Sequence, residues 1–165
     1  MGILLGLIQR KRIKMKITDI ISINKIFLNF EVTSKKILFK EISQIISKNS
    51  DLTQTAILDN LIQREKLGTT GIGDGIALPH SKIKGIKKIF SLFIRLQNPI
   101  DFSANDSKKV DIIFVIIAPN ESKTDHLLAL SEISKFLRIN GNTEKLRKYK
   151  TKERVFKLLS NVNED

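Results

Sequence analysis

The chain has 165 residues, of which 41% are hydrophobic and 28% are charged, and its formal net charge is +12. This length suits a single domain with a full hydrophobic core, and the positive charge raises the question of an anionic partner. The sequence contains no cysteine and only two histidines, which excludes disulfides, zinc–thiolate sites, catalytic thiols and histidine-rich metal sites.

A short apolar run, Ile3 to Ile8, lies near the start of the chain and is followed by basic residues. A signal peptide places its charges before the apolar run, and a transmembrane helix needs about 20 apolar residues, so neither pattern fits. We interpret residues 1–14 as a dispensable extension and residues 15–165 as the domain, because Met15 offers an alternative start. The competing interpretation is weak contact with a membrane surface; no integral membrane segment is expected.

The first part of the domain predicts one strand and two helices. Residues 26–32 partly alternate between apolar and polar positions, as a short edge strand does. A helix begins after a cap at Thr33 or Ser34. Its apolar face comprises Ile37, Leu38, Ile42, Ile45 and Ile46. A second helix begins at Asp51 or Thr53 and ends where the glycines begin.

Residues 68–75 hold four glycines in eight positions and are predicted to form a loop without regular structure. Residues 89–97 and 110–118 predict two strands, and the second is almost wholly apolar, as a strand buried on both faces is. A long helix then begins at Thr124 or Asp125. Its inward face is expected to carry Leu127, Leu130, Ile133, Phe136 and Leu137.

Two short helices, residues 143–149 and 152–159, complete the expected elements. Together the elements predict an α/β fold in which a mixed β-sheet of about five strands is sandwiched between helices on both faces.

The glycine-rich stretch, residues 68–75, is the first candidate for a functional site. Glycines let backbone amides converge on an anion without interference from a Cβ atom. We therefore expect a phosphate-cradling loop. Its members are Gly68, Thr69, Thr70, Gly71, Gly73 and Gly75. The stretch matches neither the P-loop nor the dinucleotide-binding pattern, so nucleotide binding is not indicated. The plainer alternative is a tight surface loop.

His80 follows this stretch directly after Pro79. Proline fixes its own φ and biases Leu78 toward extended geometry, so the approach to the histidine is stiff. An imidazole is nucleophilic at neutral pH and can form a covalent intermediate. The alternative is a structural histidine held by a backbone carbonyl at a strand end.

Two further residues suit the binding of a phosphoryl group. His126 lies in the first turn of the long helix, where free backbone amides favour an anion. Arg64 lies near the end of the second helix, and its guanidinium can hold a phosphate through two hydrogen bonds. Taken singly, each of them could equally be an exposed residue at a helix end.

Residues 61–80 read Leu-Ile-Gln-Arg-Glu-Lys-Leu-Gly-Thr-Thr-Gly-Ile-Gly-Asp-Gly-Ile-Ala-Leu-Pro-His. This stretch resembles the signature of the enzyme IIA family of mannitol-, fructose- and nitrogen-type phosphotransferase systems. In that family an arginine–glutamate pair precedes a G-[ST]-T-G-I-G-N-G-[IV]-A-[IL]-P-H sequence. The resemblance extends over about residues 18–160. Two departures are Asp74, where asparagine is usual, and Leu78, where isoleucine is common.

The resemblance implies a phosphoryl carrier of the phosphoenolpyruvate-dependent phosphotransferase system, located in the cytoplasm. It implies that His80 is phosphorylated on Nε2, that His126 and Arg64 assist the transfer, and that no metal or cofactor is needed. The implied donor is an HPr-type phosphocarrier protein. Asp74 would slow transfer if its negative side chain pointed toward the phosphate.

Two roles remain open within the resemblance. The chain length and the Arg-Glu-Lys-Leu-Gly-Thr-Thr-Gly run favour a nitrogen-type regulator, whose phosphorylation state controls other proteins. The alternative is sugar uptake, in which phosphate passes to a fructose- or mannitol-type IIB. Because IIB partners of this family accept phosphate on cysteine and this chain has none, we expect any IIB on a separate polypeptide.

An alternative from a different class is nucleic-acid binding, suggested by a basic stretch near the C-terminus. Its cations are Lys145, Arg147, Lys148, Lys150, Lys152, Arg154 and Lys157. Only two aromatic residues are interleaved, and no recognised binding motif is present. A solvated basic face explains the stretch better, so no nucleic-acid partner is expected.

Overall fold

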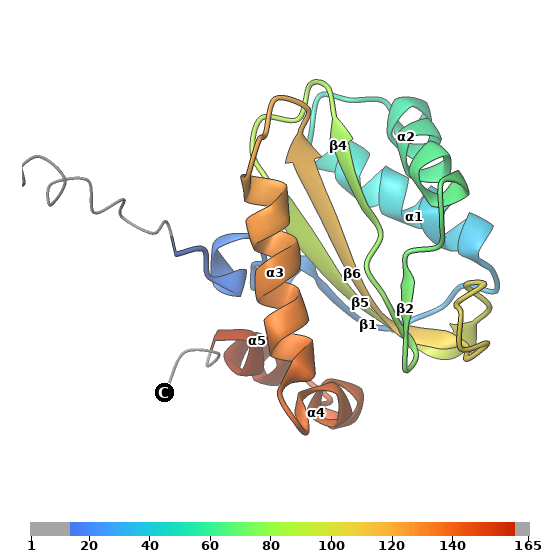
Figure 1. Ribbon diagram of the computed structural model, residues 1–165, viewed down its shortest axis with the longest axis vertical. Helices are drawn as coiled ribbons and strands as arrows, with labels where there is room; N and C mark the ends of the chain where they lie inside the picture. The colour runs from blue at the N-terminus through green and yellow to red at the C-terminus, as the bar shows by residue number, and fades with distance from the viewer. Residues whose placement is uncertain (1–13, 161–165) are drawn as a thin grey trace, which may run out of the picture.

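A computed structural model describes residues 14–160; the apolar run of residues 3–8 lies outside this range. The described chain forms a six-stranded mixed sheet with helices on both faces (Figure 1). The strands are β1 (Ile26–Phe30), β2 (Gly71–Gly73), β3 (Ile76–Ala77), β4 (His80–Ile83), β5 (Phe90–Ile100) and β6 (Val110–Pro119). The helices are α1 (Lys35–Lys48), α2 (Gln54–Lys66), α3 (Asp125–Arg138), α4 (Asn142–Lys148) and α5 (Lys152–Ser160), with 3-10 turns η1 (Ile17–Asp19) and η2 (Ile23–Lys25).

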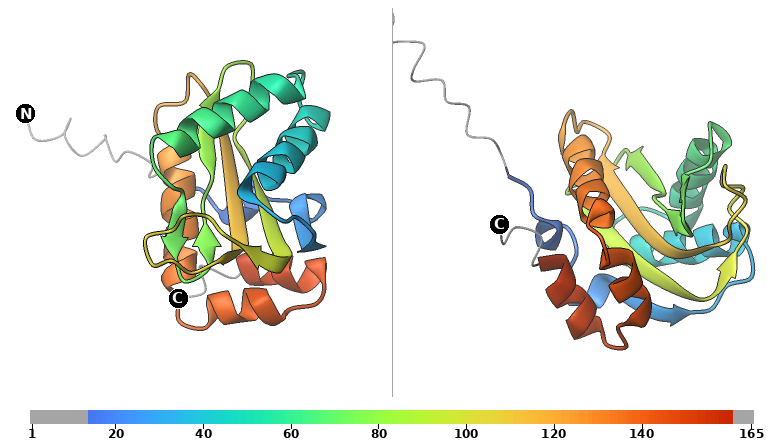
Figure 2. Two further views of the ribbon diagram at one scale, coloured as in Figure 1. Left: turned by 90° about the vertical axis from the view of Figure 1, so that its right-hand side faces the viewer. Right: turned by 60° about the horizontal axis from the view of Figure 1, so that its bottom comes forward.

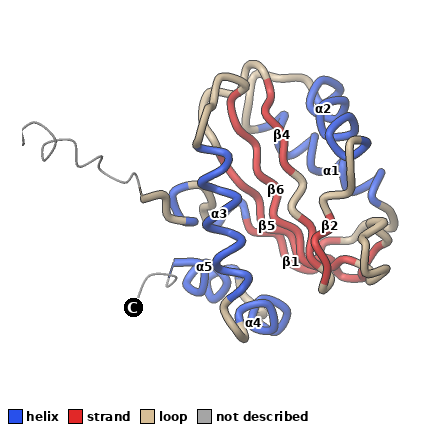
Figure 3. The backbone as a smooth tube through the Cα atoms, in the orientation of Figure 1, coloured by secondary structure: helices blue, strands red, loops and turns tan. Residues whose placement is uncertain are grey.

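The expected α/β fold is confirmed, with one strand more than the sequence predicts. The sheet order is β1-β5-β6-β3-β2, and β4 also pairs with β6 (Figure 3). β5 and β6 are antiparallel, whereas β1 runs parallel to β5, and β3 and β4 run parallel to β6. The first strand lies at the edge of the sheet, as its partial alternation predicts.

The long strand β6 separates two hydrophobic cores. Its residues Ile113, Val115 and Ile117 belong to the core beneath α1 and α2. Their neighbours Ile112, Phe114 and Ile116 belong to the core beneath α3 and α5. Alternate side chains of a strand point to opposite faces, so burial on both faces requires the continuous apolar run seen in the sequence. Figures 1 and 2 show the two helical layers on opposite sides of the sheet.

Side-chain caps decide where the first two helices begin. The hydroxyl of Ser34 accepts a hydrogen bond from the Ile37 amide, and that of Thr53 accepts one from the Ala56 amide. Each satisfies an amide that has no partner within its helix. Of the alternatives that the sequence leaves open, Ser34 and Thr53 are therefore the capping residues.

The structure corrects the expected inward face of α3. Ile133 and Phe136 are buried as predicted, but Leu127 is 57% exposed. Leu127 belongs to the first turn of the helix, where it lines a surface cavity. Helical periodicity identifies the face of the helix but not how far the sheet extends beneath it.

The prediction that residues 68–75 lack regular structure is also wrong. Gly71 and Gly73 pair with Ala77 and Ile76, so β2 and β3 form a hairpin. The two turn residues, Asp74 and Gly75, have φ of 56° and 78°, as a two-residue type I′ turn requires. An Asp-Gly dipeptide is a strong local signal for this turn, so the hairpin could have been predicted from the sequence.

Candidate functional site

A break in the sheet places His80. β3 and β4 both run parallel to β6, so they are two halves of one interrupted strand, with Leu78 and Pro79 in the gap. Proline has no amide hydrogen to donate to a neighbouring strand. The Leu78 amide turns away from β6 and donates to the carbonyl of Thr70 at 2.9 Å, while the Pro79 carbonyl accepts from the Ile116 amide at 2.9 Å. His80 is the first residue after the break.

The hydrogen bond of the His80 ring defines its tautomer. Nδ1 lies 2.8 Å from the carbonyl oxygen of Leu78. A carbonyl oxygen can only accept, so the proton is on Nδ1 and the neutral ring has its lone pair on Nε2. The structural alternative, a histidine held by a backbone carbonyl, is therefore correct for Nδ1. It does not exclude a reactive role, because Nε2 keeps its lone pair.

The surroundings of His80 favour the neutral ring. Burial lowers the pKa of His80, and the positive charge of Arg64 acts in the same direction. The hydrogen bond to Leu78 and the charge of Glu65 raise the pKa, but the net shift is downward. A neutral imidazole with a free Nε2 is the form that acts as a nucleophile.

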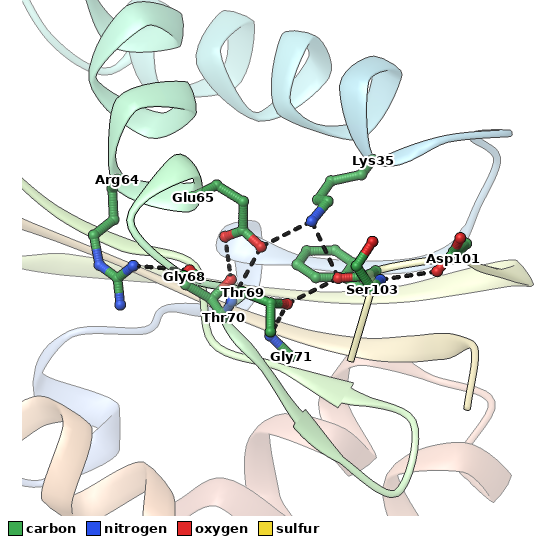
Figure 4. A network of polar contacts seen from close by, with 10 residues as sticks. Lys35, Arg64, Glu65, Gly68, Thr69, Thr70, Gly71, Asp101 and Ser103 are labelled. Carbon is green, nitrogen blue, oxygen red and sulfur yellow. Dashed lines mark hydrogen bonds and ion pairs between the residues drawn. The ribbon is translucent and has the colours of Figure 1, made fainter. Parts of the chain in front are cut away.

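Arg64 reaches this unprotonated nitrogen from the last turn of α2. Its Nη1 donates to the carbonyl of Gly68 at 3.1 Å, and its Nη2 lies 3.5 Å from His80 Nε2 (Arg64 and Gly68 are drawn in Figure 4). The carbonyl of Gly68 thereby orients the guanidinium. The remaining donors of the guanidinium are available to an anion attached to, or approaching, Nε2.

His126, in the first turn of α3, lies in the same cavity as His80 and Arg64. Its Nδ1 is buried and has no hydrogen-bond partner among the described residues. Without an acceptor at Nδ1, the tautomer with the proton on Nε2 is favoured, which leaves an N–H donor for a ligand. Burial is the largest cause that lowers the pKa of His126, followed by the charges of Lys82 and His80.

The three residues share a shallow cavity of about 260 Å³. It is lined by Arg64, His80, Ser81, Lys82, Ile116, His126, Leu127 and Leu130. Lys82 is a site residue that was not predicted from the sequence; it lies two residues after His80 in β4 and therefore on the same face of the strand. It could have been found by alternation from His80, had a strand been predicted there. With two cations and two imidazoles on apolar walls, the cavity suits a small anion such as a phosphoryl group.

The structure does not bring the glycine-rich stretch into this cavity. Within residues 14–160, no residue of the range 68–75 lines it. The hydroxyls of Thr69 and Thr70 bond to the Phe102 carbonyl and to Glu65 instead. The other end of the stretch is the β2–β3 hairpin, which lies beside Ile112 of β6, whereas His80 lies beside Ile116.

The turn residue Asp74 does not point toward the site either. Its side chain is 84% exposed and lies 3.5 Å from Lys108. A larger cavity of about 600 Å³ borders this turn, but it contains no histidine, and its Arg147 makes a bidentate ion pair with Asp111. The cavity at His80 is therefore the better candidate for phosphoryl transfer, although it is smaller, because it contains both histidines.

The basic residues of the C-terminal stretch lie in and around α4 and α5. None of them lines the His80 cavity among the described residues. Across residues 14–160, each helix is too short or too polar to cross a membrane.

Residues 19–162 match the sequence model of a family described as "Phosphoenolpyruvate-dependent sugar phosphotransferase system, EIIA 2". A nitrogen regulatory protein of Bradyrhizobium diazoefficiens is 38% identical over 146 residues, which cover 88% of this chain and 95% of that protein. A fructose-specific EIIA component of Haloferax volcanii is 38% identical over 109 residues, or 66% of this chain and 71% of that one.

Solved structures agree with this assignment. The nitrogen regulatory protein IIA-Ntr of Neisseria meningitidis superimposes with a TM-score of 0.82 at 35% identity, covering 87% of this chain and 98% of that one. The mannitol IIA of Escherichia coli has a TM-score of 0.70 at 20% identity over 84% of this chain and 98% of that one, which is evidence for the shared fold alone. The resemblance seen in the sequence is thus confirmed, and the chain belongs to the EIIA 2 family of the phosphoenolpyruvate-dependent sugar phosphotransferase system.

Proposed function

We propose that this chain is a phosphoryl carrier that accepts a phosphoryl group on Nε2 of His80 from an HPr-type phosphocarrier protein. One observation carries the proposal: the ring of His80 is held at Nδ1 by Leu78, and its unprotonated Nε2 lies 3.5 Å from Nη2 of Arg64. Membership of the EIIA 2 family supports the same reaction class. In keeping with the resemblance, we place this reaction in the cytoplasm.

In the proposed reaction the lone pair of His80 Nε2 attacks the phosphorus atom of the donor's phosphohistidine. A bond forms between Nε2 and phosphorus, the donor's nitrogen–phosphorus bond breaks, and its electron pair returns to the donor's imidazole. No proton has to move in this step. The ring of His80 gains positive charge, which the hydrogen bond from Nδ1 to the Leu78 carbonyl stabilises.

Transfer of this kind has a loose transition state and depends mainly on positioning and on charge stabilisation. Arg64 and the Nε2–H of His126 are proposed to bind the phosphoryl oxygens, with Lys82 adding positive charge. This division assigns the covalent step to one histidine and the electrostatic support to the other.

We further propose that the carrier acts as a nitrogen-type regulator. The nitrogen regulatory protein of Bradyrhizobium diazoefficiens, which matches over 88% of this chain, supports this role. The fructose-specific relative keeps sugar uptake as the second candidate. In that case phosphate would pass to a separate IIB, the kind of partner with which the mannitol IIA of Escherichia coli forms a complex.

The proposal is tested by incubating the chain with phosphoenolpyruvate, enzyme I and HPr, followed by mass spectrometry under mildly alkaline conditions. We expect one phosphoryl group on His80, none in His80→Ala, and attachment at Nε2 by NMR. Label that persists in His80→Ala would contradict the assignment.

Presenting the phosphorylated chain to purified fructose- and mannitol-type IIB domains then separates the two roles. Rapid transfer to either would favour uptake, and transfer to neither would favour regulation.

A further inference from the structure

Glu65 follows Arg64 in the sequence, but its carboxylate is turned into the protein. The side chain is only 8% exposed, and every carboxylate contact is to a donor (Figure 4). Oε1 accepts from the Thr70 amide at 3.0 Å, and Oε2 accepts from the Thr70 hydroxyl at 2.7 Å. One acidic side chain thus holds both the backbone and the side chain of a single residue of the glycine-rich stretch.

Lys35 supplies the counter-charge from the first turn of α1. Its Nζ lies 3.0 Å from Oε1 of Glu65 and donates to the carbonyl of Phe102 at 3.1 Å. The same carbonyl accepts from the hydroxyl of Thr69 at 2.8 Å. A buried carboxylate is costly unless it is paired and hydrogen-bonded, and here all of these requirements are met.

The residue held by Glu65 is connected to the ring of His80. The Thr70 carbonyl accepts from the amide of Leu78 at 2.9 Å, and the carbonyl of Leu78 accepts from Nδ1 of His80 at 2.8 Å. Leu78 lies in the sheet break, where no strand hydrogen bond to β6 fixes its amide. Its orientation therefore depends on Thr70 on one side and on Pro79 on the other.

We propose that Glu65, paired with Lys35, is a positioning residue that holds Thr70 and, through the backbone of Leu78, keeps the proton of the neutral His80 ring on Nδ1. This inference rests on the proposed function, because the tautomer matters only if Nε2 is the nucleophile. If the Leu78 carbonyl moves, the ring can carry its proton on Nε2 instead, and that nitrogen then has no lone pair for the incoming phosphorus.

A role confined to fastening the loop would leave the tautomer unchanged, so the tautomer is the decisive measurement. Long-range ¹H–¹⁵N spectra of the full chain, recorded well above the pH at which His80 titrates, distinguish Nδ1–H from Nε2–H directly. Glu65→Gln is the test variant. Asp74→Asn is the matched control, since it also neutralises a carboxylate paired with a lysine but lies in the exposed turn.

We expect a single Nδ1–H tautomer in the wild type and in Asp74→Asn, and a substantial Nε2–H population in Glu65→Gln. Phosphoryl acceptance should fall in proportion to the remaining Nδ1–H population, so that a population of about one in ten gives a loss of about tenfold. If Glu65→Gln does not fold, Thr70→Val removes only the hydroxyl contact and should shift the tautomer in the same direction.

An unchanged His80 tautomer in a folded Glu65→Gln or Thr70→Val variant would overturn the inference. A shifted tautomer would support it even if the phosphoryl label were found on another residue, so a failure of the proposed function would be recognised separately.

Discussion

Arg64 and His80 meet through Nη2 and Nε2, which lie 3.5 Å apart, while the Gly68 carbonyl holds the other end of the guanidinium at 3.1 Å. The arginine therefore faces Nε2, the ring nitrogen that is not bonded to the Leu78 carbonyl. A phosphoryl group bound there would have a fixed cation beside its oxygens. The geometry also explains why the charge of Arg64 contributes to lowering the pKa of His80.

Replacing Arg64 should slow phosphoryl transfer without unfolding the chain. We expect Arg64→Gln to reduce the transfer rate by about 100-fold, equivalent to about 3 kcal/mol of lost transition-state stabilisation. Rapid-quench measurement of transfer from phosphorylated HPr provides the rate. Arg138→Gln is the control, because it removes the same charge from an exposed position in the last turn of α3. Equal rates in the two variants would show that the guanidinium next to His80 has no role in transfer.

His126→Ala should still accept phosphate on His80 but transfer it more slowly in both directions. The substitution removes an N–H donor proposed to bind the phosphoryl oxygens, and loss of such a donor typically costs about 3 kcal/mol in the barrier. Forward and reverse rates with HPr test this expectation. If both rates match the wild type, His126 is only a neighbour of the site.

The lowered pKa values of both histidines predict a specific pH dependence. Burial favours the neutral rings in the folded state, so below about pH 6.5, the ordinary histidine pKa, the unfolded chain binds more protons than the folded chain. The free energy of unfolding should then decrease as the pH falls through and below this value. Denaturant titrations at several pH values between about pH 8 and pH 5 would measure the free energy of unfolding. In the double variant His80→Gln, His126→Gln, the free energy of unfolding should depend less steeply on pH across the same range. An unchanged dependence would contradict the lowered pKa values of the two histidines.

The domain boundary proposed at Met15 predicts that removing residues 1–14 leaves the stability unchanged, whereas a substitution a few residues after the boundary lowers it. A chain beginning at Met15 should retain its thermal midpoint and its phosphoryl acceptance, because Met15 is the first residue that packs against the core among those described. Ile21→Ala should cost about 2–5 kcal/mol, because this side chain is only 1% exposed. Calorimetry on both proteins tests the boundary. A large loss of stability on removing residues 1–14 would move the boundary toward the N-terminus.

Two glycines of the 68–75 stretch should respond differently to alanine. At Gly75, φ is +78°, and a Cβ atom would lie 2.6 Å from Nη2 of Arg147, so we expect Gly75→Ala to destabilise the domain by about 1–3 kcal/mol. At Gly68 a Cβ atom would meet nothing within 4 Å, and Gly68→Ala should change stability by less than about 0.5 kcal/mol. Urea denaturation compares the two. If the two costs are similar, the hairpin turn does not impose the constraint inferred from its backbone.

Local patterns in the sequence were sufficient for most of the secondary structure. The two cap regions, which the sequence narrows to Thr33 or Ser34 and to Asp51 or Thr53, the helical spacing of apolar residues, and the continuous apolar run of β6 all depend on residues close together in the chain. The Asp74–Gly75 turn belongs to the same class, since its signal is local. The number of glycines alone predicts an irregular loop, whereas the Asp-Gly dipeptide predicts the turn.

The sequence by itself also determined the family and singled out Arg64, His80 and His126, because the residues that carry the resemblance are read directly. Only the tertiary structure decided how these side chains meet, since the cavity combines α2, β4 and α3. The short strand β4 exists because it pairs with β6. This pairing places Lys82 on the same face as His80, and the break before β4 holds the Leu78 carbonyl that fixes the His80 tautomer. Local periodicity cannot specify such features, because their hydrogen bonds and contacts join segments that are distant in the chain and adjacent only after the sheet has formed.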